Sequence, residues 1–86
     1  MTPLERKQTL ENHLKTALDP LELAIIDESH LHGGHAGASA GASHFAVKIK
    51  SHALDGLNRV KQHQKVYAAV GYLIPHEIHA LRITVL

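Results

Sequence analysis

The sequence predicts a small α+β domain in which two helices pack on one face of a three-stranded mixed sheet. Apolar residues recur at helical spacing in two segments and alternate with polar residues in three others. The order of these segments is helix, strand, strand, helix, strand. A chain of 86 residues is about the size of one domain, so we assign residues 1–86 to a single domain.

The first helix is expected over residues 3–18. A capping box marks its start, with Thr2 as the N-cap and Glu5 reaching back to it. Asp19 precedes a proline, which disfavours helical geometry and ends the helix. The apolar stripe of this helix consists of Leu4, Leu10, Leu14, Ala17 and Leu18.

The first two strands are expected at residues 21–27 and 44–51, and they most simply form an antiparallel hairpin. Ala24 and Ile26 make the second side of the first strand apolar, which favours a strand covered on both faces. The core-facing residues are expected to be Leu21, Leu23 and Ile25 in the first strand and Phe45, Val47 and Ile49 in the second.

The second helix is expected to follow a turn at Asp55 and Gly56 and to run from residue 57 or 58 to about residue 73. The third strand is expected at residues 79–86, and a crossover through the helix can make it parallel to the second strand. The apolar face assigned to this helix carries Val60, Val66, Tyr67, Val70, Leu73 and Ile74.

Between the first two strands lies a histidine-rich segment with almost no large apolar side chains, which we interpret as a mobile surface loop. Neutral imidazole is a good ligand for zinc, iron and copper. The alternative is a solvated connector, which suits His30, His32 and the outward-facing His44 in particular. His35 in this loop and His79 at the start of the third strand could lie at one edge of the molecule.

Two imidazoles are half of a four-coordinate metal site, so three hypotheses about these histidines remain. The chain has no cysteine, so thiolate ligands would come from a partner protein or a small thiol. A simple divalent-metal binder is a second reading. In the third, His79 is only a hydrogen-bonded residue at a strand start.

Other functional classes find little support in the composition. No nucleophile elbow, H-E-x-x-H motif or Walker lysine loop occurs, so we expect no enzyme. The formal net charge is +1 with histidines neutral, which differs from the basic balance of a dedicated nucleic-acid binder. There is no run of 18 apolar residues and no signal-like N-terminus, so we expect a soluble cytoplasmic protein without membrane contact.

Nucleic-acid binding remains the runner-up. Arg59, Lys61 and Lys65 give the second helix a modest basic face, and lysine and arginine suffice for phosphate contacts. The alternative is an ordinary solvated helix face.

Four stretches occur together in this chain: D-E-S-H followed by G-H-A-G, then S-H-F-A-V-K-I, then G-L-N-R-V-K-Q-H-Q-K-V-Y-A-A-V, and last I-H-A-L-R-I. In this combination the chain resembles the BolA family. The resemblance implies an α+β fold of the class II KH type, in agreement with the order of elements expected above.

The resemblance also implies a function. BolA-like proteins pair with monothiol glutaredoxins and share a 2Fe–2S cluster in iron–sulfur trafficking or iron regulation. It implies His79 and His35 as ligands, with His32 as a possible substitute, and thiolates from the glutaredoxin and glutathione. The chain would be a monomer alone and a heterodimer with its partner. Many members carry arginines where this chain has Gln62 and Gln64, which argues against the alternative, a small DNA-binding transcriptional regulator.

Overall fold

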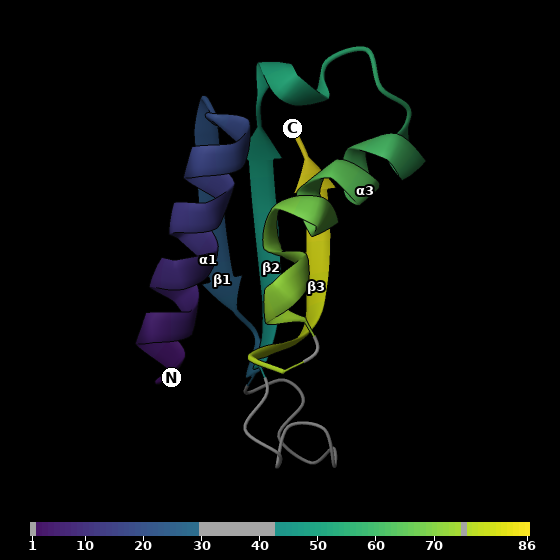
Figure 1. The fold of residues 1–86 in the computed structure, drawn as a ribbon. Coiled ribbons are helices and arrows are strands. Elements are labelled where there is room, and N and C mark those ends of the chain that lie inside the picture. Colours follow the sequence, from purple (N-terminus) through teal and green to yellow (C-terminus); the bar gives the residue numbers. More distant parts are fainter. Residues whose placement is uncertain (1, 30–42, 75) are drawn as a thin grey trace.

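The computed structural model describes residues 2–29, 43–74 and 76–86. The elements are α1 (Pro3–Leu18), β1 (Glu22–Asp27), β2 (Ser43–Lys50), the 3₁₀ helix η2 (His52–Leu54), α3 (Arg59–Val70), the 3₁₀ helix η3 (Gly71–Leu73) and β3 (Ile78–Val85). The sheet order is β1-β2-β3, with β1 antiparallel to β2 and β2 parallel to β3. The two α-helices lie on the same face of the sheet, which confirms the predicted architecture (Figure 1).

Helix α1 begins and ends where the sequence predicts. The backbone N–H of Glu5 donates to the Thr2 hydroxyl at 3.1 Å, and the Thr2 N–H donates to the Glu5 carboxylate at 3.0 Å. The bond from the Thr2 N–H stabilises the charged carboxylate and lowers the pKa of Glu5. Asp19 ends the helix with a φ of 44°, in the left-handed region that closes many helices.

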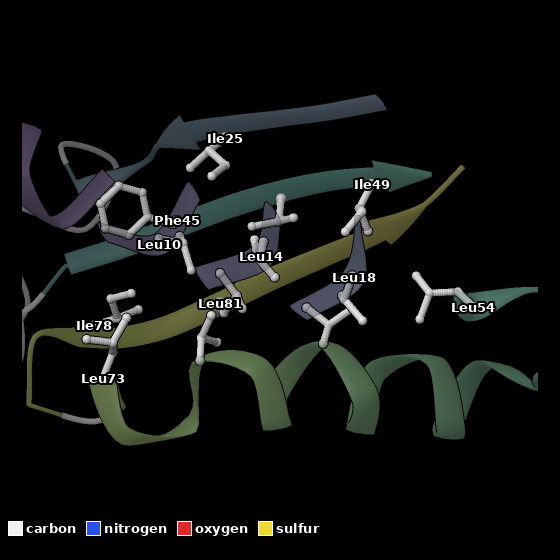
Figure 2. Close-up of a cluster of buried hydrophobic side chains, with 13 residues drawn as sticks. Leu10, Leu14, Leu18, Ile25, Phe45, Ile49, Leu54, Leu73, Ile78 and Leu81 are labelled. Atoms are coloured by element: carbon white, nitrogen blue, oxygen red, sulfur yellow. The ribbon is translucent and has the colours of Figure 1, made fainter. Parts of the chain in front are cut away.

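The core lies between the sheet and the two helices, and Figure 2 shows its side chains converging from both layers. Each helix contributes one stripe to it, and the sheet contributes alternate residues. Within the described ranges, no helix has the length and apolar character needed to cross a membrane. The core cluster consists of Leu10, Leu14, Leu18, Ile25, Phe45, Val47, Ile49, Leu54, Val66, Val70, Leu73, Ile78 and Leu81.

Several residues assigned to the core by pattern are exposed. Leu4 is 63% exposed and Val60 is 64% exposed. Each precedes the nearest buried residue of its helix, Leu10 or Val66, by six positions, which places it about 120° around the helix. The helices therefore bury narrower stripes than predicted. Ala17, Leu21 and Tyr67 are also exposed.

The second face of β1 is open, contrary to the sequence expectation. Ala24 is exposed and Ile26 is 45% exposed, whereas Ile25 is buried. Ile25 belongs to the core on the helix side of the sheet (Figure 2), and no described element covers the other face (Figure 1). The apolar pair on the outer side of this short strand therefore does not indicate a second covering layer, and the prediction of burial on both faces is wrong.

The narrow helix stripes can be tested by truncation. Leu14→Ala should lower the free energy of unfolding by about 2–5 kcal/mol, because it removes buried apolar contacts and leaves a cavity. The matched variant Leu4→Ala should change it by less than about 0.5 kcal/mol, because Leu4 is mostly in solvent. Urea unfolding followed by circular dichroism measures both, and equal losses would contradict the difference in burial between Leu14 and Leu4.

Candidate functional site

The candidate site lies at one end of the sheet. Because β1 is antiparallel and β3 is parallel to β2, the end of β1 and the starts of β2 and β3 meet there (Figure 1). Ser29 and Ser43, which flank the histidine-rich segment, both lie at this end. The predicted ligand His35, its possible substitute His32 and His30 lie outside the described residues.

A bulge positions His79. Ser43 pairs with Ile78 and His44 pairs with Ala80, so β3 advances two residues where β2 advances one. His79 is the extra residue, and it is exposed. Bulges of this kind re-aim a side chain and are common beside functional sites.

The bulge brings His79 to His44, a residue that the sequence predicts to be solvated and outward-facing. Their ring centroids are 5.1 Å apart with the planes tilted by 47°. Each histidine is the second residue of its strand, and β2 and β3 are parallel. Both strands begin with one residue followed by histidine, an x-His pair. When two parallel strands start at the same level, this pattern predicts that the two histidines lie close together.

An ion pair crosses the outer face of the sheet beside the two histidines. Arg82 on β3 donates two hydrogen bonds to the Glu28 carboxylate, at 2.6 and 3.2 Å. The backbone N–H of Glu28 donates to the His44 carbonyl at 2.8 Å, so the acid lies beside His44 at the end of β1. The hydrogen bonds and charge of Glu28 raise the pKa of Arg82. This bidentate pair links the two edge strands across β2.

A second arginine reaches the same end of the sheet from the helix side. Arg6 of α1 donates to the Ser43 hydroxyl at 3.3 Å, and its Nε lies 3.5 Å from a carboxylate oxygen of Glu77. The Arg6 side chain is only 14% exposed. Its contacts hold the residue before His44 and the residue two before His79. The strand ends that carry the two histidines are therefore held by Arg6 on the helix side of the sheet and by the Arg82–Glu28 pair on its outer face.

The donor chemistry of this end fits an incomplete metal site. The described residues contain no group of three or more histidine, cysteine, aspartate or glutamate side chains arranged to hold a metal. What they provide is two neighbouring imidazoles, and the chain has no thiolate to add. Such a half-site suits a metal or cluster whose remaining ligands come from another molecule.

The three basic residues predicted on the second helix are all exposed, but they do not form one face. Lys61 and Lys65 are four residues apart and share a row of α3. Arg59 lies about 200° around the helix from Lys61 and lines a hollow beside β3. None of the three has an ion-pair partner in the part of the chain that the structure describes.

Comparison with known proteins gives concordant matches. The model of the family described as BolA-like protein matches residues 14–86. The chain is 38% identical to Protein BOLA1, chloroplastic, of Arabidopsis thaliana, covering 91% of this chain and 51% of that protein. It is 35% identical to the DNA-binding transcriptional regulator BolA of Haemophilus influenzae, covering 87% and 70%. It spans about half the length of BOLA1, and 22% of SufE-like protein 1 of Arabidopsis thaliana.

Solved structures agree with the sequence matches. The BolA domain of SufE1 from Arabidopsis thaliana superposes with a TM-score of 0.81 and 34% identity, covering 93% of this chain and 88% of that one. BolA1 from Arabidopsis thaliana gives a TM-score of 0.77 with 36% identity, covering 92% and 87%.

The role of Arg6 can be tested directly. Arg6→Ala should lower the free energy of unfolding by about 1–3 kcal/mol, because it removes charge-assisted bonds from a largely buried position. Amide hydrogen exchange should accelerate at His44 and His79. Lys15→Ala, on the same helix but exposed and in an i,i+4 pair with Glu11, should have a much smaller effect and leave both amides unchanged. Equal exchange in the two variants would show that Arg6 does not hold this end of the sheet.

Proposed function

Because the chain belongs to the BolA-like family, we propose that it is a non-enzymatic partner of a monothiol glutaredoxin. In this proposal the two proteins share a 2Fe–2S cluster in iron–sulfur trafficking or iron regulation. The observation that carries it is the exposed His79 beside His44 at the end of the sheet. Clusters with mixed thiolate and imidazole ligands are chemically established. The named relatives are BolA-like proteins and regulators rather than enzymes, which is consistent with a partner role.

His79 is the principal ligand in this proposal. The second imidazole comes from His35, with His32 as a substitute, or from His44, which already lies beside His79. Thiolate ligands come from the glutaredoxin cysteine and from glutathione, because this chain has no cysteine. The chain is then a monomer alone and forms a heterodimer when the cluster is shared.

The principal ligand is tested by His79→Ala. Mixing the variant with a monothiol glutaredoxin, glutathione and a reconstituted cluster should give no heterodimer spectrum in visible absorption and circular dichroism. His52→Ala is the matched control, because His52 follows the other end of β2, is largely exposed and pairs with Asp55. It should leave the heterodimer spectrum intact. A wild-type mixture whose spectrum equals that of the glutaredoxin homodimer would refute the proposal.

The second ligand is tested by comparing His35→Ala with His44→Ala. If His35 is the ligand, its removal should make the cluster more labile, with partial rescue by His32. If His44 is the ligand, the loss of spectrum should follow His44→Ala instead. Cluster lifetime measured by the decay of visible absorbance separates the two. Unchanged lifetimes in His35→Ala, His44→Ala and His79→Ala would show that the site is wrongly placed.

The second candidate function is DNA binding. It is favoured by the exposed Lys61 and Lys65 on α3 and by the name of the Haemophilus influenzae relative. Gln62 and Gln64 interrupt the basic residues, and Arg59 lies on another side of the helix. We therefore propose at most about three phosphate contacts and no sequence-specific DNA complex for the isolated protein.

A salt series tests this second function. The logarithm of affinity for duplex DNA should fall with the logarithm of salt concentration by about 0.9 per phosphate contact, so the slope should not exceed about −2.7. A glutaredoxin complex measured in parallel should survive moderate salt. Tight binding to one DNA sequence at physiological salt, lost in Arg59→Ala and kept in His79→Ala, would favour the regulator instead.

A further inference from the structure

A hollow lies between α3 and the second half of β3, away from the histidine pair. Its volume is about 250 Å³, and it is lined by Arg59, Gln62, His63, Ile83, Thr84 and Val85. Arg59, His63 and Tyr67 are spaced four residues apart and so form one row along α3. The Tyr67 hydroxyl donates to the Leu81 carbonyl at 2.8 Å, which closes one end of the groove between this row and β3.

The strand that borders the hollow is an edge strand. β3 is last in the sheet order, and no described strand pairs with its outer side. The N–H of Leu86 donates to the Ile49 carbonyl at 2.8 Å, so residues 84 and 86 direct their main-chain groups to β2. Main-chain groups alternate along a strand in a parallel ladder, so those of Ile83 and Val85 point to the free edge.

The side chains around this edge favour a negatively charged ligand. Arg59 is exposed and, in the described structure, has no ion-pair partner. His63 lies one turn further along the helix, and the amide nitrogen of Gln62 donates to the Leu54 carbonyl at 3.2 Å. No carboxylate lines the hollow. A ligand carboxylate placed there could pair with the Arg59 guanidinium, because no acidic side chain of the hollow already occupies that position.

We propose that the free edge of β3 binds an acidic peptide segment of a partner protein in extended conformation. Its main chain pairs with Ile83 and Val85, and a carboxylate side chain enters the hollow against Arg59 and His63. The alternating donors and acceptors of a strand edge match a peptide backbone, whereas a phosphate backbone offers acceptors only. Lys61 and Lys65 lie in another row of α3, so the groove lacks the repeated cations that a nucleic-acid strand requires.

Fluorescence anisotropy tests the proposal with a fluorescein-labelled six-residue peptide that alternates glutamate and valine. Wild-type protein should bind it, and Arg59→Ala should weaken binding by about tenfold or more. Lys48→Ala, an exposed cation on the outer face of β2, should not change the affinity. His79→Ala should also bind normally, so this result is independent of the glutaredoxin proposal. A peptide with lysine in place of glutamate should bind poorly, and equal affinity for both peptides would overturn the proposal.

Backbone pairing is tested separately. Bound peptide should slow amide hydrogen exchange at Ile83 and Val85, and N-methylation of the peptide valines should abolish binding. Val85→Pro removes one edge donor while the bond from Leu86 to Ile49 can persist, so it should weaken binding in a protein with a native spectrum. Protection elsewhere in wild-type protein would overturn the proposal. So would Arg59-dependent binding of a single-stranded oligothymidylate without binding of the acidic peptide.

Discussion

The parallel pairing of β2 with β3 is the constraint on which the site depends. Ile78 and Leu81 are both buried, although residues three apart in a regular strand face opposite sides. The single-residue bulge at His79 restores the inward direction of Ile78 while Leu81 keeps its place. Burial of two apolar residues thus leaves His79 exposed beside His44. The position of the imidazole is a consequence of core packing, since the bulge is what lets both apolar residues face inward.

Two arginines hold this end of the sheet in physically different ways. Arg6 is largely buried and contacts Ser43 and Glu77, so its loss would remove charge-assisted contacts from a poorly hydrated position. Arg82 is exposed, and exposed ion pairs contribute little to stability. Its bidentate geometry still fixes the distance between the end of β1 and β3. Arg6 is therefore mainly a stabilising residue, whereas Arg82 is mainly a positioning residue for the strand ends beside the histidines.

The sequence predicted the element order, the sheet topology and the end of α1 because capping, alternation and crossover rules act locally. The predicted burial of Leu4 and Val60 is wrong, because the sequence does not show how wide a stripe of each helix the sheet covers. The sequence also does not show that the outer face of β1, which carries Ile26, is exposed to solvent. The two x-His strand starts indicate that His44 and His79 lie close together, but no local pattern in the chain indicates the bulge at which His79 is the extra residue.

The two ends of β3 can serve separate partners. His79 is near its start, and the hollow lies against residues 83–85, so the two positions are roughly 13–20 Å apart along the strand. In the proposed glutaredoxin complex the cluster is held at His79, at the other end of β3 from the hollow beside Arg59. A partner that carried both a glutaredoxin domain and an acidic segment would gain affinity by linkage without any new contact. Linkage of this kind requires a tether that spans the distance between His79 and the hollow, so only acidic segments within reach of the glutaredoxin domain would benefit.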